Sequence, residues 1–260
     1  MITSGEKQFI SNVRAALGHA PHKKRAWSEL SYINLNPKTD ERLAKIKNRT
    51  PQESQELLLK LIQQSEPLGF KVFPFKDKVS VAVDIVRIIR EKQPEWGGQK
   101  FVTVWKHPLI DSLNLVQVLN EQNILVPVYY TELECDPQNE ESAQAGRQRI
   151  KNNISDSFIG VTSADFCLAD TATLVMKTRL GQARAVSLVP YIHIAVIEKE
   201  SIIADLKELY ALLKSDDQNS ASLTNCLTFI TGPSKTADIE GVMVHGAHGP
   251  REIYLYVITG

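Results

Sequence analysis

The chain has 260 residues, enough for one large domain or two small ones around a substantial core. Its 30 basic and 30 acidic residues give a formal net charge of zero, without the basic excess that a nucleic-acid-binding surface requires. No apolar run approaches the roughly 20 residues of a membrane span, and the first residues lack the pattern of a signal peptide. We therefore expect a cytoplasmic protein with no membrane span and no nucleic-acid partner.

The number and spacing of the cysteine and histidine residues limit the kinds of metal site that the chain can form. Cys135, Cys167 and Cys226 are far apart in the sequence and form no C-x-x-C pair. Such a sparse set is typical of a reducing compartment and cannot supply the four thiolates of a self-contained iron–sulfur cluster. His245 and His248 are close in sequence, but two histidines alone rarely make a metal site. We predict that the chain carries neither a metal nor another cofactor of its own.

The first part of the chain is predicted to be helical. Apolar residues at helical spacing predict a helix over residues 4–17. Residues 39–66 show a second helical pattern that breaks at Pro51, because proline is tolerated in the first turn of a helix but not in its middle. We expect residues 1–68 to form a helical N-terminal region and residues 69–260 to form an α/β domain.

From residue 70 onwards, strand and helix patterns alternate at the spacing of parallel βα units. The predicted strands of this part are Phe70–Phe75, Phe101–Trp105 and Ile124–Tyr130, and the predicted helices are Val79–Arg90, Leu109–Asn120 and Gln144–Asn153. Later strands follow one another more closely, at Phe158–Thr162, Thr173–Met176, Ile192–Ile197, Leu227–Thr231, Val242–Val244 and Ile253–Ile258, with one further helix at Ile202–Leu213. Consecutive strands without intervening helices indicate antiparallel additions. The predicted fold class is therefore α/β with an open mixed sheet.

A first polar stretch runs from Gly160 to Leu174 and reads GVTSADFCLADTATL. It places carboxylates and hydroxyls among small residues, at Thr162, Ser163, Asp165, Asp170, Thr171 and Thr173. Polar groups at strand ends are the usual lining of a small-ligand pocket. The same residues also fit two tight turns in which Asp and Thr side chains bond their own backbone. Composition alone leaves both interpretations open.

A second stretch, Ile230–Glu240, reads ITGPSKTADIE. Here a strand enters a loop with Gly232, two hydroxyls and Lys235, a combination that can hold a carboxylate or a phosphate. The alternative is an ordinary Gly-Pro turn with a solvated lysine. The order of residues is not that of a Walker loop, and no G-x-G-x-x-G fingerprint occurs in the chain.

A third stretch, His245–Pro250, reads HGAHGP. Its glycines flank His248 and predict a turn that presents an imidazole for acid–base chemistry or anion binding, or that merely holds the ring by a hydrogen bond. Nucleophilic catalysis has little support, because no G-x-S-x-G elbow exists and apolar neighbours should raise the pKa of Cys167.

These motifs carry a resemblance to a known family. GVTSADFCLADTATLV, GQARAVSLVPYIHIAVI and ITGPSKTADIEGVMVHGAHGP follow one another between Gly160 and Pro250, and together they resemble the lactate utilisation protein C family, also called LutC/YkgG or the LUD-domain family. The resemblance implies an open α/β sheet of the sugar-isomerase and CoA-transferase (NagB/RpiA/CoA transferase-like) type, with a ligand cleft at the strand ends. It also implies a role beside iron–sulfur subunits in oxidising L-lactate to pyruvate.

The resemblance and the strand-end pattern together define a candidate ligand site. Its residues are Thr162, Asp165, Asp170, Thr171 and Thr173 in the first motif, Arg184 and His193 in the second, and Thr231, Gly232, Ser234, Lys235, Asp238 and His248 in the third. The chain departs from the family where Ala172 stands for a common glycine, Asp170 for glutamate and Lys235 for arginine. Lysine keeps the charge of arginine but loses its planar fork, so the identity of the ligand stays open.

Three functions fit these observations. The first is an accessory or regulatory subunit of a lactate-oxidising system, with iron–sulfur subunits as partners and a small anionic ligand in the cleft. The second is a stand-alone enzyme acting on a CoA thioester, a folate or a sugar phosphate, with Asp165 or Asp170 as acid–base group and Lys235 with Arg184 holding the anion. The third is a structural scaffold. The motifs assign no catalytic residue.

Overall fold

The computed structural model describes residues 4–16, 37–94, 100–132, 140–216, 226–237, 243–245 and 249–260. The chain divides into two compact units, Met1–Arg42 and Leu43–Gly260. Helix α1 (Ser4–Ala16) belongs to the first unit, and α3 (Pro37–Lys47) crosses the division. The second unit holds every strand in the described part of the chain.

A six-stranded sheet forms the centre of the second unit. Its strands, in spatial order, are β1 (Phe70–Phe75), β12 (Glu252–Ile258), β7 (Ile192–Glu198), β4 (Ile159–Ser163), β2 (Val102–Val104) and β3 (Val128–Tyr130). All neighbouring pairs are parallel. The inner strands are buried on both faces, which explains their nearly continuous apolar sequences. Because the strands are parallel, their carboxyl ends share one edge of the sheet.

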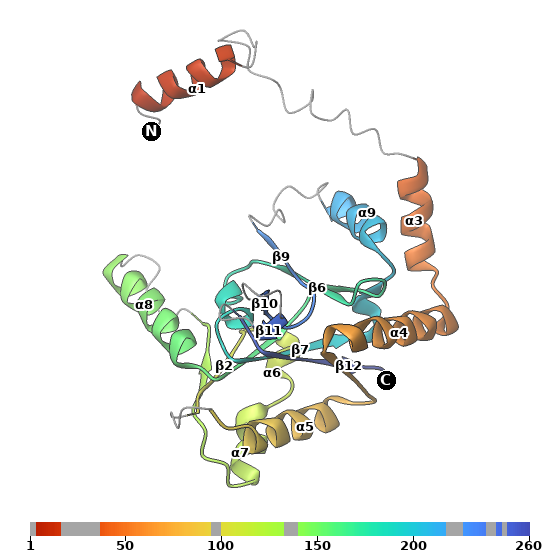
Figure 1. The fold of residues 1–260 in the computed structure, drawn as a ribbon, viewed down its shortest axis with the longest axis vertical. Helices are drawn as coiled ribbons and strands as arrows, with labels where there is room; N and C mark the ends of the chain where they lie inside the picture. Colours follow the sequence, from red (N-terminus) through yellow and green to blue (C-terminus); the bar gives the residue numbers. More distant parts are fainter. Residues whose placement is uncertain are drawn as a thin grey trace. The chain divides into compact units, whose positions relative to one another are not determined.

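Helices cover one face of this sheet. They are α5 (Lys78–Glu91), α6 (Pro108–Asp111) and α7 (Leu115–Glu121), of which α5 and α7 lie below the sheet in Figure 1. Val81, Ile85 and Ile89 recur at helical spacing along α5 and are buried against Tyr256 and neighbouring strand residues. A side chain of Asp77 caps this helix by accepting a hydrogen bond from Ser80 N at 2.8 Å.

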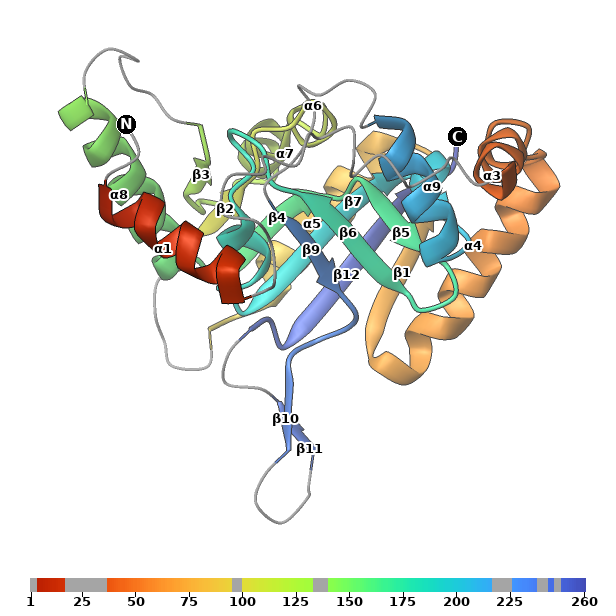
Figure 2. The ribbon, with the colours of Figure 1, turned by 90° about the horizontal axis from the view of Figure 1, so that it is seen from above.

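A second, four-stranded sheet covers the opposite face. Its strands, in spatial order, are β8 (Ile202–Ile203), β5 (Phe166–Leu168), β6 (Thr173–Lys177) and β9 (Leu227–Ile230). Two helices contribute apolar residues to the same layer: α4 (Pro51–Ser65) through Leu58 and Leu61, and α8 (Glu140–Asp156) through Ile154. In Figure 2 the strands of the second sheet cross in front of β7 and β12. A second large cluster of buried apolar residues therefore lies between the two sheets.

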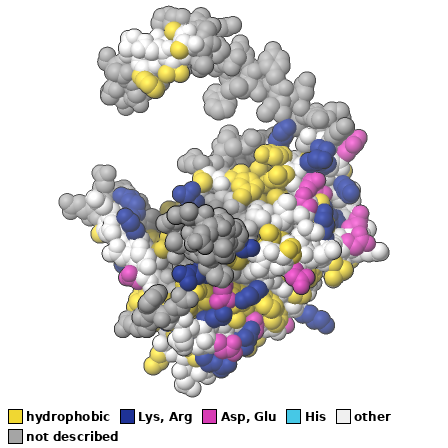
Figure 3. All heavy atoms as spheres, viewed as in Figure 1, with side chains coloured by type: hydrophobic (Ala, Val, Ile, Leu, Met, Phe, Trp, Pro, Cys, Tyr) yellow, Lys and Arg dark blue, Asp and Glu magenta, His cyan; other side chains and the backbone are white. Residues whose placement is uncertain are grey.

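The outer side of the four-stranded sheet packs against α9 (Leu206–Asp216) through a small cluster around Leu209. Figure 3 shows hydrophobic side chains gathered over α9 and β9, and the exposed members there are Leu206, Tyr210 and Phe229. A separate antiparallel ribbon, β10 (Lys235–Ala237) with β11 (Met243–His245), extends from the end of β9.

Helix boundaries in the N-terminal part follow local sequence chemistry. The predicted break at Pro51 is confirmed, since α3 ends at Lys47 and α4 begins at Pro51. Thr50 starts α4 with a capping box, in which its hydroxyl accepts from Glu53 N and the Glu53 carboxylate accepts from Thr50 N at 2.8 Å. Strand β1 spans the predicted residues Phe70–Phe75.

Two predicted helices are shorter in the structure. The helix expected at Ile202–Leu213 begins only at Leu206, because Asp205 accepts hydrogen bonds from the next turn and the two preceding isoleucines pair with β5 instead. The helix expected at Leu109–Asn120 divides into α6 and α7. Asn114 has a φ of 48° at the division, a left-handed conformation that asparagine tolerates but that ends a helix.

The predicted α/β class with an open sheet is confirmed, and parallel and antiparallel strands are both present. They are divided between two sheets: the antiparallel pairs β5–β6 and β6–β9 belong to the second sheet, not to the edges of the first. None of the helices in the described ranges combines the length and apolar character that crossing a bilayer demands.

Candidate functional site

The direction of the chain changes between β2 and β4, which are neighbours in the sheet. After β2 the chain enters α6 and α7 on one face, whereas after β4 it enters the second sheet on the other face. Such a switch of direction leaves a crevice outside the carboxyl ends of the two strands, and open α/β sheets bind their ligands there. The topology therefore selects one position on the sheet edge.

A hollow of about 400 Å³ lies at this position. We call it the switch-point hollow, and it is lined by Lys78, His107, Pro108, Leu109, Ser163, Ala164, Asp165, Glu198 and Ser201. Its volume is within the usual range of small-molecule sites. The lining comes from residues at or after the carboxyl ends of β1, β2, β4 and β7, so it gathers side chains from widely separated parts of the sequence.

His107 is a titratable residue in the lining of the switch-point hollow. It caps α6, and its Nδ1 accepts a hydrogen bond from Leu109 N at 3.1 Å. An imidazole that accepts through Nδ1 carries its proton on Nε2 when neutral. Burial lowers the pKa of His107, opposed by the carboxylates of Asp165, Asp111 and Glu198 and reinforced by Arg179. At neutral pH His107 therefore offers an N–H donor.

Asp165 lines the hollow, but both of its carboxylate oxygens already accept hydrogen bonds from within the protein. Its Oδ2 accepts a hydrogen bond from Lys177 N at 2.7 Å, and its Oδ1 accepts from the Arg179 guanidinium at 2.6 Å. The Asp165 side chain is 12% exposed, whereas that of Arg179 is 45% exposed. Both carboxylate oxygens are therefore engaged, and Asp165 holds the Arg179 guanidinium beside the hollow.

The structure joins the first and third sequence motifs through hydroxyls. Thr173 Oγ1 lies 2.9 Å from Thr171 Oγ1 and 2.7 Å from Thr231 Oγ1, and we call these three residues the hydroxyl cluster. Thr173 is buried, while Thr171 and Thr231 are exposed. Ala172 is fully buried in the same turn with a φ of 46°, a conformation in which glycine is less strained.

Asp170 precedes the hydroxyl cluster at the turn between β5 and β6. Its backbone N donates to Ala204 O at 3.2 Å, and its Oδ1 is buried without a hydrogen-bond partner among the described residues. Asp165 lies at the other end of the same β5–β6 hairpin, beside Lys177. The two carboxylates that the sequence nominates as acid–base groups are thus not part of one cleft.

Thr162 and His193 form a buried pair between the two sheets. Thr162 Oγ1 lies 2.8 Å from His193 Nε2, and neither residue is exposed. His193 Nδ1 has no partner among the described residues, and burial lowers the pKa of this histidine to about 3. The pair belongs to the core behind the hollow, because β4 continues from Thr162 into Ser163 of its lining.

The remaining candidate residues are dispersed. Gly232 has a φ of 86° and approaches Leu68, and Ser234 N donates to Pro250 O at 2.8 Å, which places both near the amino ends of β1 and β12. Lys235 is exposed on β10, and Arg184 contacts Cys226 Sγ at 3.6 Å. Asp238 and His248 lie outside the described residues.

Sequence reasoning missed several side chains that line the switch-point hollow. His107, Lys78, Glu198 and Ser201 all line it, and none belongs to the candidate set. One signal was present: Lys106-His107-Pro108 directly follows the apolar run FVTVW, where a polar residue falls at the carboxyl end of a strand. The signal is weak because a single histidine after a strand is common in loops.

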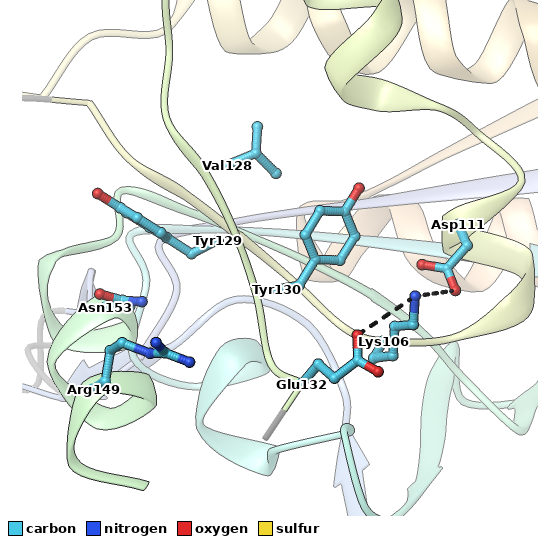
Figure 4. A pocket seen from close by; sticks show the side chains of 8 residues that line it. All are labelled: Lys106, Asp111, Val128, Tyr129, Tyr130, Glu132, Arg149 and Asn153. Carbon is cyan, nitrogen blue, oxygen red and sulfur yellow. Dashed lines mark ion pairs between the residues drawn. The ribbon is translucent and has the colours of Figure 1, made fainter. Parts of the chain in front are cut away.

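A larger hollow of about 630 Å³ surrounds the edge strand β3 (Figure 4). Tyr129 lies on one side of the strand with Arg149 from α8, and Tyr130 lies on the other with Lys106. The Lys106 ammonium is 3.3 Å from one carboxylate, Asp111, and 3.7 Å from another, that of Glu132. The positive charge of Lys106 is therefore balanced by two carboxylates of the protein, and β3 runs through the hollow. For both reasons this hollow is less suited to a small anion than the switch-point hollow.

The fold defines the class: an α/β protein with an open parallel sheet and a hollow at its switch point. Comparisons with known proteins identify the family. The model of the LUD domain matches residues 58–258. Lactate utilization protein C of a Geobacillus species is 31% identical over 184 residues, covering 69% of this chain and 70% of that protein. Its counterpart from Halalkalibacterium halodurans is 30% identical over 182 residues and 70% of each chain.

The fold is also shared with a solved structure. The crystal structure of a DUF162 family protein from Deinococcus radiodurans superimposes with a TM-score of 0.50 at 18% identity, covering 80% of this chain and 98% of that one. At this identity the similarity concerns the fold alone. Taken with the family match over residues 58–258, these findings show that the chain belongs to the LUD-domain family.

Proposed function

We propose that the chain is an accessory or regulatory subunit of a cytoplasmic lactate-oxidising system and that it holds a small anionic ligand in the switch-point hollow. The observation that carries the proposal is the similarity to two proteins named lactate utilization protein C, at 30% and 31% identity over more than two thirds of the chain. The position of the hollow at the carboxyl ends of β2 and β4 supports the ligand.

The resemblance to the lactate utilisation protein C family implies iron–sulfur partners, and the electron balance of lactate oxidation is consistent with them. Oxidising L-lactate to pyruvate removes two electrons and two protons, which a redox group must accept. The three cysteines of this chain cannot ligate a four-thiolate cluster, and burial raises the pKa of Cys167, which disfavours the thiolate that a metal needs. We therefore assign the electron-accepting iron–sulfur clusters to separate partner subunits, with this chain acting beside them.

The test is isolation of the tagged chain from cells grown on L-lactate. We expect cysteine-rich, iron-containing proteins to co-elute with it, and a tagged Glu56→Gln variant, altered only on the exposed side of α4, should retain the same proteins. Failure of any such protein to associate would overturn the proposal. Ligand-dependent turnover by the isolated chain that disappears in Asp170→Asn would favour the stand-alone enzyme instead.

A further inference from the structure

The ion pairs around the switch-point hollow differ in strength. Arg179 and Asp165 are 2.6 Å apart, and Asp165 also accepts from a backbone N–H. Lys78 Nζ and Glu198 Oε1 are 3.9 Å apart, and their side chains are 43% and 54% exposed. An exposed pair at this separation contributes little to stability. Lys78 is thus the cation of the hollow that can exchange its partner at small cost.

Apart from the carboxylates of Asp165 and Glu198, the polar side chains of the lining can all donate hydrogen bonds. His107 presents Nε2–H, because Leu109 N occupies Nδ1. The hydroxyls of Ser163 and Ser201 have no partner among the described residues, although Ser163 is only 3% exposed. Lys78 also begins α5, whose N-terminal end carries partial positive charge. A neutral imidazole, two hydroxyls and a lysine together favour an acceptor group such as a carboxylate.

The carboxylate of Glu198 is a hydrogen-bond acceptor, so it can distinguish between ligands that the donors would bind equally. Once Lys78 turns to a bound carboxylate, the Glu198 carboxylate is left as an acceptor beside the ligand. A hydroxyl on the carbon next to the ligand's carboxyl group can donate a hydrogen bond to the Glu198 carboxylate. An oxo group at that position cannot donate, and it would place two acceptors against each other. A site built around such a hydrogen bond rejects the analogue that lacks the donor.

We infer that the switch-point hollow is a binding site for a short 2-hydroxy carboxylate, in which Lys78 and His107 hold the carboxyl group and Glu198 reads the hydroxyl. The inference rests on the proposed function and deepens it by naming the ligand class and the residues that select it. The hollow of about 400 Å³ suits an acid of a few carbons.

The experiment is isothermal titration of the full chain with L-lactate, pyruvate and acetate at neutral pH. We expect L-lactate to bind at least tenfold more tightly than pyruvate. Lys78→Gln and His107→Ala should each weaken L-lactate at least tenfold, and Glu198→Gln should remove the preference, because the amide can donate to an oxo group. Lys60→Gln and Glu56→Gln, on the exposed side of α4, are the matched controls and should leave both affinities unchanged.

His107→Asn is the second variant at this position, for the case in which His107→Ala does not fold. Asparagine is a good helix N-cap and can keep the hydrogen bond from Leu109 N. Absence of L-lactate binding, equal affinity for pyruvate, or normal binding by a folded Lys78→Gln variant would each overturn the inference. These results leave the proposed function separately testable, because co-purification with iron–sulfur proteins does not depend on the hollow. Loss of partners with intact lactate binding would reject the function and keep the site.

Discussion

The hydroxyl oxygens of Thr173 and Thr231 lie 2.7 Å apart, although the two residues are 58 positions apart in the sequence. The contact extends the β6–β9 ladder, in which Leu174 faces Ile230, by one further side-chain pair. It also explains why two motifs of this family can be distant in sequence and still act as one structural element. Since β9 pairs only with β6 among the described strands, the contact helps to hold the edge of the second sheet.

Thr173→Val should test this contact. Valine keeps the shape but removes the hydroxyl, so we expect a loss of about 1 kcal/mol in the free energy of unfolding, together with faster amide exchange in β9. The double variant with Thr231→Val should lose less than the sum of the single variants, because both remove the same bond. Thr228→Val on the same strand is the control; an equal effect there would assign the loss to strand propensity instead.

His193 should make stability depend on pH. Its pKa is lowered from 6.5 to about 3 by burial, so the unfolded chain binds a proton that the folded chain excludes as pH falls below 6.5. Stability is therefore full above this pH and decreases on acidification, by about 2 kcal/mol between pH 7 and pH 5.

Urea unfolding at the two pH values measures this effect. In His193→Gln the group no longer titrates, and the difference between the two pH values should shrink by about 2 kcal/mol relative to the original chain. The half-buried His107, whose pKa is also lowered, contributes in the same direction and stays in both proteins. An unchanged pH dependence in the variant would show that His193 is not the buried neutral group described.

We expect the ion pair between Arg49 and Glu208, a residue of α9, to stabilise the folded protein. Its guanidinium donates to both carboxylate oxygens of Glu208 at 2.7 and 2.8 Å and to Ile202 O at 3.2 Å, and Glu208 also accepts from Ala204 N. The two side chains are 11% and 9% exposed. Arg49→Met leaves the carboxylate without its cation, so we expect a loss of about 3 kcal/mol.

Arg49→Lys separates charge from geometry. Lysine restores the charge without the planar fork, so its loss in urea unfolding should be smaller, about 1 kcal/mol. If methionine and lysine at this position cost the same, the fork and not the buried charge carries the interaction. A cost near zero for both would contradict the structure at this site.

Replacing Gly160 or Gly69 by alanine should lower the free energy of unfolding, for a different reason at each position. A Cβ at Gly160 would lie 2.0 Å from Val186 O, in the 3₁₀ turn η2 (Arg184–Ser187) that packs on β4. A Cβ at Gly69 meets nothing within 4 Å, but the residue has a φ of 74°. We expect about 3 kcal/mol for Gly160→Ala and about 1 kcal/mol for Gly69→Ala, measured by thermal unfolding.

Only the first of these substitutions should also disturb the neighbouring turn. Amide chemical shifts of η2 should move in Gly160→Ala and stay in place in Gly69→Ala. The reverse pattern, or a harmless Gly160→Ala, would mean that η2 does not rest on the backbone of β4.

Long apolar patterns made most of the fold predictable. The strand at Phe70–Phe75 and the helix break at Pro51 follow from local sequence alone. The strand at Phe166–Leu168 did not, because three residues carry no periodicity and their conformation is fixed by pairing with β6 and β8. The domain boundary at residue 68 stays a prediction.

The candidate site was less predictable than the fold. Polar residues at strand ends are visible in the sequence, but their meeting depends on strand order and register, as the Thr173–Thr231 contact shows. His107 enters the site only because β2 and β4 are neighbours, a tertiary relationship that no local pattern encodes. That the expected ligand contacts bind a ligand stays a prediction.

The most direct test of the central claim is lactate-dependent dye reduction by the purified iron–sulfur partners, with and without this chain. Each L-lactate that becomes pyruvate passes two electrons through the partners to the dye. An accessory subunit predicts that adding the chain raises the rate of the partners, while the chain alone reduces no dye. An unchanged rate with the chain present, or reduction by the chain alone, would contradict the account.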